Sequence, residues 1–588
     1  MNKFTAIVDK DKCAPNKCQL ECIKFDPLNR VKDGEGFHIG QDKKAVISEK
    51  VVTEMHKIPA KKCPFEAIKI IKLPSELKQE PVHQYGQNEF RLFTLPVPKK
   101  ETVVGVIGRN GIGKTTALAI LSGSLNANLG DYNNEKNLDI VEIYSNSILG
   151  GYFEKLREHK IKVSYKPQRI ELLPEVYKGR KVKELIEKSD ELRISKELIS
   201  KLDMKSILDR NVEELSGGEL QKLAIVACLI KNAQVYYLDE PMSFLDITTR
   251  INVARLIREL KKSIIVVEHD LTSLDYISDE VQIVYGERGA YGIFSQSKGV
   301  RNGVNEYLDG YIKSDNVKFR DYAIRFNESP VTKTKTDVML FEFPEMEKKF
   351  ESFELKVESG KVNKGEVIGV VGANGLGKST FLKLITGQEK ADKGKVDKVK
   401  FSYKPQYIKA EKGNVLDYLK EKAGNSFNSG WYKQNILEKL GVGNILMSEM
   451  KNLSGGELQK VMVAGCLSED VELVLMDEPS AFVDVEDRLN MAEIIKDFII
   501  RKEICAIIVD HDIQFVDYLS DSLLVFEGKS GINGRMEGIN EKREGMNKVL
   551  KMLDITYRVD KTTGRRRINK PRSQLDQQQR KKGEFYYR

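Results

Sequence analysis

An internal repeat constrains this chain more than any other feature of its sequence. A sequence of the form G-x-x-x-x-G-K-[ST] occurs at 108–115 and again at 372–379. Each copy follows a run of strand-forming residues and precedes a helix-forming run, which is the setting that a phosphate-binding loop requires. Because further motifs follow each copy in the same order, neither loop is an accidental match.

Four motifs are shared by the two copies. They are Y-K-P-Q at 165–168 and 403–406, L-S-G-G-E-L-Q-K at 215–222 and 453–460, D-E-P at 239–241 and 477–479, and Glu268-His269-Asp270 with its counterpart Asp510-His511-Asp512. Gln168 and Gln406 are 238 positions apart, whereas Lys114 and Lys378 are 264 apart. The first copy therefore carries 26 additional residues, within about 125–158. We interpret this insert as a dedicated contact surface, with a neutral insertion as the alternative.

The two loops predict two sites for ATP and Mg²⁺. Glycines allow backbone N–H groups to approach the phosphates, and the following helix directs its positive end at them. The residues expected to bind ATP are Asn110, Gly111, Gly113, Lys114, Thr115, Thr116 and Gln168 in the first copy, and Asn374, Gly375, Gly377, Lys378, Ser379, Thr380 and Gln406 in the second. The residues expected to hold Mg²⁺ are Thr115, Gln168 and Asp239, and Ser379, Gln406 and Asp477.

Hydrolysis requires a group that orients the attacking water. Glu240 and Glu478 directly follow the Mg²⁺ aspartates, where a carboxylate can polarise that water. His269 and His511 each end an apolar run, and in this setting we interpret them as groups that sense or position the γ-phosphate. A purely structural histidine is the alternative.

The L-S-G-G-E sequence resembles the signature of ABC-type cassettes. In such cassettes the signature of one copy closes over the ATP that the other copy holds, so the resemblance pairs Lys114 with Ser454 and Lys378 with Ser216. The residues that it adds to the two sites are Ser216, Gly217, Gly218 and Asp246, and Ser454, Gly455, Gly456 and Asp484. Tyr85, Phe90 and Phe343 precede the loops and are candidate platforms for adenine, with a place in the core as the alternative.

The rest of the composition favours a cytosolic ATPase without a membrane domain. The longest purely apolar run is 224–230, whereas a spanning helix needs about 20 residues. The N-terminus lacks the apolar core of a secretory signal. Of the net charge of +9, most lies in 558–588, which predicts either a surface that binds polyanions or a solvated tail.

The chain resembles the ABC-E family of ribosome-recycling ATPases, also called RNase L inhibitors, over essentially its whole length. The segments that carry the resemblance are 62–65 (K-C-P-F), His83-x-Tyr85, 110–114, 307–311 (Y-L-D-G-Y), 319–321 (F-R-D) and 567–570 (R-I-N-K). The resemblance implies a monomer that splits terminated or stalled ribosomes and can then stay on the small subunit. It implies as partners small-subunit rRNA and proteins, a class-1 release factor or its rescue paralogue, and initiation factors, but neither membranes nor DNA.

Two other functions remain open. The chain could regulate translation from the ribosome without splitting it, or it could be a redox-linked ABC ATPase. In the recycling interpretation, we expect the insert, a hinge at about 299–321 and the basic C-terminus to contact small-subunit RNA, mainly through phosphates.

The N-terminal cysteines depart from the family pattern. Members resemble ferredoxins with eight cysteines for two [4Fe–4S] clusters, whereas this chain has Cys13, Cys18, Cys22 and Cys63. Asp26, Thr53, His56 and Pro59 stand at the positions of the other four. One complete ligand set is thus kept and the other is lost, which predicts a single [4Fe–4S] cluster. Zn²⁺ in the same thiolates, a metal-free domain, and a metal bound by Asp26 and His56 are the alternatives.

These observations predict an α/β fold with two tandem ABC-type P-loop ATPase domains, a small ferredoxin-like α+β domain and a hinge. The expected divisions are 1–75 for the iron–sulfur domain, 76–290 for the first nucleotide-binding domain, 291–325 for the hinge, 326–545 for the second nucleotide-binding domain and 546–588 for a basic C-terminal hinge or tail. Cys228, Cys466 and Cys505 lie singly in apolar stretches and are expected to pack in the core.

Overall fold

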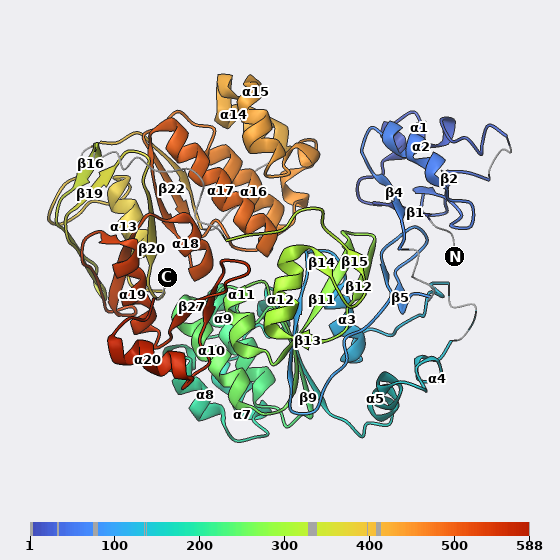
Figure 1. Cartoon of the computed structure of the whole chain (residues 1–588), viewed down its shortest axis with the longest axis horizontal. Coiled ribbons are helices and arrows are strands. Elements are labelled where there is room, and N and C mark those ends of the chain that lie inside the picture. Colours follow the sequence, from blue (N-terminus) through green and yellow to red (C-terminus); the bar gives the residue numbers. More distant parts are fainter. Residues whose placement is uncertain are drawn as a thin grey trace.

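Two large sheets with the same strand order organise the two halves of the molecule (Figure 1). The computed structural model describes residues 4–31, 35–74, 80–133, 136, 138–326, 338–396, 398–406 and 413–586. The first sheet has the order β5-β6-β12-β11-β7-β10-β9-β8, with β13 beside β11. The second has the order β17-β18-β25-β24-β20-β23-β22-β21, with β26 beside β24. The repeat in the sequence is therefore a repeat of the fold.

The strands of each sheet are short and follow one plan. In the first sheet they are β5 (His83–Gln84), β6 (Arg91–Leu92), β7 (Val103–Ile107), β8 (Val163–Lys166), β9 (Val235–Asp239), β10 (Ser263–Val267), β11 (Glu280–Glu287), β12 (Tyr291–Phe294) and β13 (Lys298–Gly299). In the second they are β17 (Met346–Lys349), β18 (Glu354–Val357), β20 (Val367–Val371), β21 (Phe401–Lys404), β22 (Leu473–Asp477), β23 (Cys505–Val509), β24 (Ser522–Lys529), β25 (Asn533–Met536) and β26 (Asn540–Glu541). A separate pair, β16 (Met339–Phe343) and β19 (Gly360–Asn363), lies beside the second sheet.

Each half also contains helices, several of which pack on the parallel part of its sheet. In the first half they are α3 (Lys114–Leu121), α4 (Ile140–Ile143), α5 (Ile148–Arg157), α6 (Leu173–Val176), α7 (Val182–Ser189), α8 (Ser195–Lys201), α9 (Gly217–Leu229), α10 (Ile247–Glu259) and α11 (Leu271–Ile277). In the second half they are α13 (Lys378–Ile385), α14 (Val415–Ala423), α15 (Gly430–Tyr432), α16 (Gly455–Cys466), α17 (Val485–Lys502) and α18 (Ile513–Leu519). Among the described residues, no helix combines the length and the apolar character needed to cross a membrane.

The central strands explain where the functional residues lie. Every residue of β7, β9, β20 and β22 is buried, as expected for parallel strands that are covered on both faces. Because β7, β9 and β10 run parallel, their carboxyl ends meet at one edge of the sheet. That edge carries the first phosphate-binding loop after β7, Asp239 at the end of β9 and His269 after β10. The second sheet repeats this arrangement.

The N-terminal module is a small α+β unit on the first half of the molecule, seen in blue at the upper right of Figure 1. It contains β1 (Phe4–Val8), α1 (Glu21–Lys24), β2 (His38–Ile39), β3 (Ala45–Val46), α2 (Lys57–Lys62) and β4 (Ile68–Lys72), with β1 and β4 antiparallel. Asn88 anchors it to the cassette: its carbonyl accepts from the Val8 N–H at 2.9 Å, and its amide binds Ala6 O and the Ile47 N–H. Asn88 lies between β5 and β6, so this hairpin joins the module to the first sheet.

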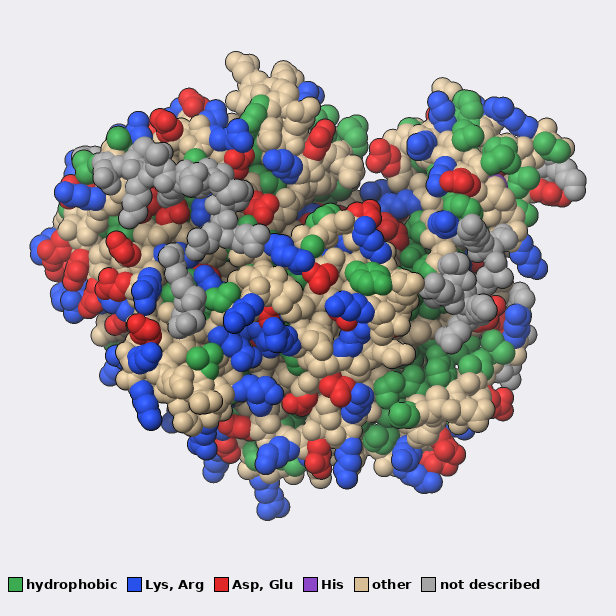
Figure 2. Space-filling view, in the orientation of Figure 1, with side chains coloured by type: hydrophobic (Ala, Val, Ile, Leu, Met, Phe, Trp, Pro, Cys, Tyr) green, Lys and Arg blue, Asp and Glu red, His purple; other side chains and the backbone are tan. Residues whose placement is uncertain are grey.

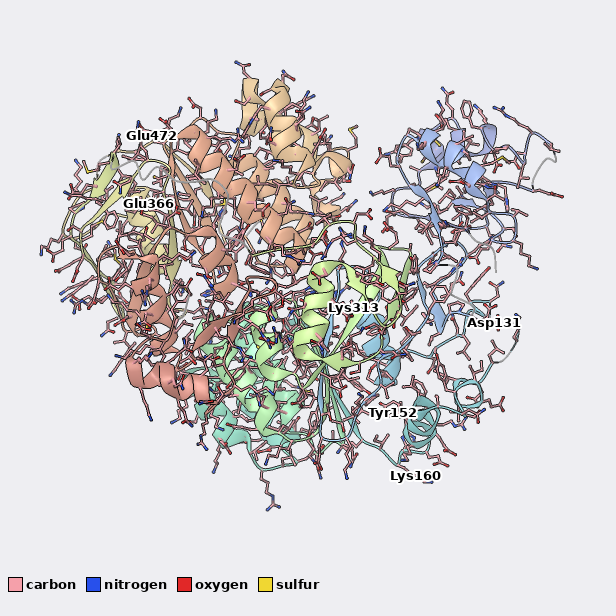
Figure 3. The ribbon with its side chains drawn as sticks, viewed as in Figure 1. Asp131, Tyr152, Lys160, Lys313, Glu366 and Glu472 are labelled. Carbon is pink, nitrogen blue, oxygen red and sulfur yellow. The ribbon has the colours of Figure 1, made fainter. Side chains whose placement is uncertain are left out.

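The insert of the first cassette contains the helix pair α4 and α5. The Tyr152 hydroxyl donates to Leu121 O at 2.6 Å, and the Tyr237 hydroxyl donates to Tyr152 at 2.8 Å, so α5 is fixed to the cassette core. Figure 3 labels Tyr152 within α5 and Lys160 just after it, on the side of the molecule that also carries Asp131. Ile143 and Ile148 expose 56% and 76% of their surface, which leaves an apolar face available for contact.

Similar segments follow both sheets. The first contains α12 (Val300–Asp309), β14 (Tyr311–Ile312) and β15 (Val317–Lys318). The second contains α19 (Lys542–Met552), β27 (Tyr557–Val559), β28 (Arg566–Ile568) and α20 (Gln574–Lys582). α12 packs on β11 as α19 packs on β24, so these helices are also part of the repeat.

The basic C-terminal segment is not a solvated tail, and three of its arginines do not form a surface for polyanions. Arg567 binds both oxygens of Asp275 in α11, at 2.7 and 2.8 Å, and Arg565 is fully buried with Nη1 3.8 Å from Asp275. Arg566 lies 3.4 Å from Asp517 in α18. The charge count could not reveal this, because buried carboxylates of both cassettes neutralise the arginines. Figure 2 shows that other Lys and Arg side chains still gather on the face around β27 and α12, where Arg301 and Lys561 are exposed.

Candidate functional site

A cavity of about 590 Å³ lies between the first phosphate-binding loop and the signature of the second cassette. Its predicted lining residues are Tyr85, Phe90, Asn110, Gly111, Gly113, Lys114, Thr115, Thr116, Gln168 and Glu240 from the first cassette, and Ser454, Gly455 and Gly456 from the second. The structure therefore brings Lys114 and Ser454 to the same site, as the head-to-tail arrangement requires. A cavity of this size, between the N-terminal ends of two helices that can each bind an anion, is suited to a nucleotide.

Both loops have the backbone geometry of a phosphate cradle. Gly113 and Gly377 precede α3 and α13 with φ values of 89° and 91°, in the region that favours glycine. A Cβ on Gly113 would lie 2.6 Å from the ring of Phe90, so a larger residue would not fit there. The Lys114 ammonium donates to Gly108 O and Arg109 O at 2.9 and 2.7 Å, and Lys378 makes the matching bonds in the second loop. Each lysine is thus held over its loop, where phosphate oxygens could replace the carbonyls.

The signature helices present a second anion-binding end. Ser216 and Ser454 cap α9 and α16, and each serine accepts from the N–H three residues later in a capping box. Gly455 packs against Phe482, where an added Cβ would lie 3.1 Å from the ring. In the first cassette Gly217 packs in the same way against Phe244. The two phenylalanines meet edge to face at 5.2 Å, so the cassettes contact one another through these loops.

Glu240 lies at the wall of the cavity and is held by several side chains. Its Oε1 accepts from Gln168 Nε2 at 2.7 Å and lies 3.4 Å from His269 Nε2. Its Oε2 accepts from the Ser243 hydroxyl at 3.1 Å. Burial disfavours its charged form, but the contact with His269 and the charge of Lys114 outweigh burial and hold the pKa of Glu240 at about 2. Glu240 is therefore an ionised carboxylate that can orient a water molecule.

The second cassette reproduces this arrangement. Gln406 Nε2 donates to Glu478 Oε1 at 2.7 Å, and His511 Nε2 lies 3.3 Å from the same oxygen. Burial is again outweighed, here by the contact with His511 and by the charges of Arg250 and Lys378, so the pKa of Glu478 is about 2. Arg250 belongs to the first cassette, and its contribution shows that the electrostatics of this site cross the interface.

The donors expected for Mg²⁺ lie close to one another and suit a hard cation. Both carboxylate oxygens of Asp239 are buried without a hydrogen-bond partner among the described residues. Burial, reinforced by the charge of Glu240, raises the pKa of Asp239 to about 6. The Thr115 hydroxyl donates to Gln168 Oε1 at 3.3 Å, and the Ser379 hydroxyl donates to Asp477 Oδ2 at 2.9 Å. A divalent cation would satisfy these oxygen ligands, which fit Mg²⁺.

Contacts across the interface also surround the second phosphate-binding loop. The Asn374 N–H donates to Asp246 Oδ2 at 3.0 Å, and Arg250 Nη1 donates to His511 O at 3.4 Å. Asp246 and Arg250 come from the first cassette. At the first site the Asn110 amide donates to Phe482 O at 3.4 Å. Burial alone would raise the pKa of Asp484, but the hydrogen bond from the Asp487 N–H and nearby positive charges, among them Lys114 of the first cassette, lower it. The pairing of Lys378 with Ser216 stays a prediction.

One candidate adenine platform is wrong. Phe343 is fully buried in β16, where it packs edge to face against Phe381 at 5.6 Å. The counterpart of Phe90 in the second cassette is Phe353, whose ring lies 3.0 Å from the position of a Cβ on Gly377, as the Phe90 ring lies against Gly113. Tyr85 and Phe90 do line the first cavity. The offset of 264 residues between the loops places the counterpart of Phe90 one position from Phe353, so this signal was available in the sequence.

The cavity also contains residues that the motifs did not reveal. They are Arg169, Arg288, Gly289 and Phe482. Arg288 Nη2 binds Glu457 Oε1 at 3.1 Å, which links the first cassette to the signature helix of the second. Arg288 has no motif around it, and its role depends on the hairpin between β11 and β12. Phe482 lies two residues before the predicted site residue Asp484, so its proximity in sequence to that residue was a usable signal.

The four N-terminal cysteines form one neighbourhood. Burial and, after it, the proximity of Cys63, Cys13 and Cys18 raise the pKa of the Cys22 thiol to about 12. Within the described ranges, no three His, Cys, Asp or Glu side chains converge on a point that would hold a single metal ion. In an iron–sulfur cluster each thiolate binds a different iron, so its four ligands need not converge in this way. Four cysteines near one another supply the thiolates that such a cluster needs.

The positions of the missing cysteines do not fit a second cluster. Asp26 and His56 are almost completely buried, with Asp26 Oδ1 3.7 Å from His56 Nε2. His56 Nδ1 accepts from the Thr53 N–H at 3.0 Å, and Asp26 Oδ2 accepts from the Phe37 N–H at 2.7 Å. The edge of the Phe37 ring meets His56 at 6.2 Å. Side chains that bind each other and the backbone thus occupy the place where four further thiolates would be needed.

Comparisons with known proteins agree with this architecture. The ABC transporter family profile matches residues 94–243 and 355–481, and a profile described as a possible Fer4-like domain in RNase L inhibitor matches residues 5–34. An uncharacterized ABC transporter ATP-binding protein of Methanocaldococcus jannaschii is 46% identical over 99% of this chain and 97% of its own length. A structure of ribosome-bound archaeal Pelota and ABCE1 matches with a TM-score of 0.93 and 44% identity, over 100% of this chain and 99% of that chain. A complex of archaeal ribosomal stalk protein aP1 with archaeal ribosome recycling factor aABCE1 matches with a TM-score of 0.82 and 46% identity, over 87% of this chain and 100% of that chain. The predicted fold of two tandem ABC ATPase domains with a ferredoxin-like N-terminal domain is confirmed.

Proposed function

Because the chain belongs to the ABC-E family of ribosome-recycling ATPases, we propose that it is the ATP-driven factor that separates terminated or stalled ribosomes into subunits. It hydrolyses ATP in its two ABC domains. The observation that carries the proposal is the composite cavity, because ATP bound there would contact both cassettes at once. Binding then favours closure of the cassettes, and hydrolysis by water oriented at Glu240 and Glu478 releases them.

A ribosome-splitting assay tests this function. Terminated ribosomes are mixed with ATP, a release factor or a rescue factor, and the protein, and subunit separation is followed by light scattering. We expect splitting by the unmodified chain and little turnover by the Glu240→Gln, Glu478→Gln double variant, because an oriented catalytic group commonly contributes ~10²–10⁴-fold. Binding to the ribosome without any splitting would instead favour the translation regulator that does not separate subunits. A midpoint potential that responds to ATP and to ribosomes would favour the redox-linked ATPase.

We further propose that the N-terminal module holds one [4Fe–4S] cluster, bound by Cys13, Cys18, Cys22 and Cys63. The buried contacts of Asp26, His56 and Thr53 support this number, because they fill three of the other four ligand positions with side chains that pack against one another and bind the backbone. When bound, the cluster supplies four iron–thiolate bonds that tie the two cysteine segments together. The module would then act as a rigid body that the cassettes move.

Iron and sulfide analysis of the anaerobically purified chain tests the cluster number. We expect about four irons per chain, and a value near eight would refute the proposal. Zinc without iron would favour a Zn²⁺ site in the same thiolates. The matched variant replaces Asp26, Thr53, His56 and Pro59 with cysteine. If those positions are the lost ligands of a second cluster, reconstituting this variant should raise the iron content towards eight.

The proposed partners follow from the family and from surfaces of this chain. The related structures are of ABCE1 with Pelota on the ribosome and of aABCE1 with the ribosomal stalk protein aP1. We propose that this chain acts beside a rescue factor of the Pelota type or its class-1 release-factor paralogue, and that initiation factors meet it on the small subunit. The exposed face of the insert around Ile143 and Ile148, and the basic side chains near β27 and α12, are the proposed contacts with the small subunit.

A further inference from the structure

Two lysines that belong to neither the phosphate-binding loop nor the signature are fully buried behind the catalytic glutamates. Lys166 and Lys404 are the lysines of the two Y-K-P-Q motifs and have 1% and 0% of their surface exposed. Each lies at the end of a strand, β8 in the first cassette and β21 in the second. Lysine is almost never buried to this extent unless its ammonium group has partners. The identity of those partners therefore shows what the lysine does.

Both ammonium groups bind the main chain of the residues that carry the chemistry. Lys166 Nζ donates to Asp239 O at 2.8 Å and to Glu240 O at 3.2 Å. Lys404 Nζ donates to Asp477 O at 2.6 Å and to Glu478 O at 3.0 Å. The same two bonds thus occur in two independent copies. They join each lysine to the Mg²⁺ aspartate and to the glutamate that follows it.

The backbone that these bonds hold is in an unfavourable conformation. Glu240 and Glu478 both have φ of +48°, in the left-handed region that residues with a side chain rarely adopt. Such a conformation is energetically unfavourable and persists only where the surroundings hold it. The N–H of Glu240 donates to Val267 O at 3.0 Å, and that of Glu478 donates to Val509 O at 2.8 Å. The lysine binds the carbonyl oxygen of each strained residue, and in the first cassette Gln221 Nε2 donates to the same oxygen at 2.7 Å.

The same short segment also holds the glutamate side chain. Gln168 and Gln406 follow the lysines by two residues and donate to the carboxylates of Glu240 and Glu478 at 2.7 Å. The intervening proline disfavours the helical conformation for the lysine and keeps it extended. Residues 166–168 therefore hold Glu240 at two points, its carbonyl and its carboxylate. A shift of this segment would move the carboxylate relative to the bound nucleotide.

We propose that Lys166 and Lys404 are positioning residues for ATP hydrolysis, which keep the main chain of Glu240 and Glu478 in the conformation that aims each carboxylate at the attacking water. Lys166 does not line the first nucleotide cavity, so it acts through Glu240, and Lys404 makes the matching contacts with Asp477 and Glu478. Burying an ammonium group costs several kcal/mol, and an apolar side chain could fill the same space without this cost. The alternative is a purely structural lysine that stabilises the sheet edge. A misplacement of the glutamate by about 1 Å could cost ~10²-fold in rate.

The first experiment separates catalysis from binding. Lys166→Met is placed in a Glu478→Gln background, so that turnover reports on the first site. We expect kcat to fall ~10–100-fold, while the Kd for the fluorescent analogue mant-ATP changes less than about 2-fold. A structural role would lower the melting temperature and leave the kcat of the folded protein unchanged, and this result would overturn the proposal. Lys404→Met in a Glu240→Gln background is the reciprocal experiment for the second site.

The second experiment tests whether the lysine acts through the glutamate. Lys166→Met is combined with Glu240→Gln, and the losses in kcat are compared with those of the single variants. A residue that works only through Glu240 should add little loss once the carboxylate is gone. If the fold-loss in kcat of the double variant equals the product of the two single losses, the lysine acts independently of Glu240 and the proposal is refuted.

Two further variants keep the test informative if the Met variants are unstable. Lys166→Gln retains a donor on a shorter side chain, and we expect a smaller fall in kcat than for Lys166→Met, again with ATP affinity retained. Ser164→Ala is the matched control, because Ser164 is a buried residue of the same strand whose hydroxyl binds Cys228 O on α9 rather than the glutamate. A fall in kcat for Ser164→Ala as large as for Lys166→Gln would assign the effect to the strand as a whole and overturn the proposal.

Discussion

Nε of Arg109, in the first phosphate-binding loop, lies 3.7 Å from Oε2 of Glu486, at the beginning of α17 in the second cassette. Glu486 also lies 3.4 Å from Arg320 and accepts from the Tyr322 hydroxyl, and both of these residues belong to the segment between the cassettes. One buried carboxylate thus joins a nucleotide loop to that segment. The second cassette has Ala373 at the position of Arg109, so the matching ion pair cannot form at the second site.

Replacing Arg109 with alanine should weaken closure at the first site only. The Arg109 side chain is about half exposed, at 51%, and a pair of this kind commonly contributes ~0.2–1 kcal/mol. We expect a reduction of about 2–5-fold in the ATP that a Glu240→Gln variant retains on a filter after a chase with unlabelled nucleotide. Arg535→Ala is the control, because Arg535 binds Glu358 at 3.0 Å within one cassette. An equal loss in the two variants would contradict the prediction.

Replacing Asp275 with asparagine should release the C-terminal segment from the first cassette. Asp275 is almost fully buried and receives two hydrogen bonds from Arg567. Breaking one partner of a buried ion pair typically costs ~3–5 kcal/mol. We expect a lower melting temperature and faster proteolysis after residue 554. Asp517→Asn tests the attachment of the same segment to the second cassette, and unchanged proteolysis in both variants would show that neither contact holds it.

Phe353 and Phe343 should respond differently to substitution by alanine. Phe353→Ala removes the ring beside Gly377 and should weaken ATP binding at the second site by about tenfold, since stacking on a base is commonly worth ~1–3 kcal/mol. Phe343→Ala removes a core ring and should cost ~3–5 kcal/mol of stability. Nucleotide titration in a Lys114→Ala background and thermal unfolding measure the two effects. A loss of affinity in folded Phe343→Ala that matched that of Phe353→Ala would restore Phe343 as the platform.

The pH dependence of stability should contain a contribution from Glu268. Burial, opposed by the Met242 N–H and reinforced by the charge of Glu240, raises the pKa of Glu268 to about 7, above the 4.5 of an ordinary glutamate. The folded state therefore binds this proton more tightly. The stabilisation of the folded state by this proton is complete below about pH 4.5 and is lost as the pH rises through about 7. From denaturant titrations at pH 5 and 8.5, we expect Glu268→Gln to be the more stable protein at pH 8.5 by up to about 3 kcal/mol. A difference from the unmodified chain that is the same at both pH values would exclude this assignment.

The sequence was sufficient to locate residues whose place follows from local spacing. Lys114, Glu240 and His269 each follow a buried strand of one parallel sheet, so the motif and the strand together determine where the side chain lies. The meeting of Lys114 with Ser454 required knowledge of how two such cassettes associate, and the resemblance supplied it. The cavity between the cassettes agrees with that expectation.

Other features depend on packing that no short motif encodes. Phe343 and Phe353 are both aromatic and both precede the second loop, but only Phe353 lies beside Gly377, and the offset between the loops rather than a motif distinguishes it. Arg565 and Arg567 could not be assigned by counting charges, because their partner Asp275 lies about 290 positions away. Lys166 was part of a recognised motif, yet its partners are carbonyl groups, which all residues share.

The hairpin of β5 and β6 gives the N-terminal module a share in the energetics of nucleotide binding. Tyr85 and Phe90 on this hairpin line the first cavity, while Asn88 between them binds the module. If ATP binding moves or orders this hairpin, it therefore also changes which positions of the module are favoured. Thermodynamic linkage makes this coupling reciprocal. A ribosome that restrains the module would change the affinity of the first site for ATP by the same factor by which ATP changes the equilibrium of the module.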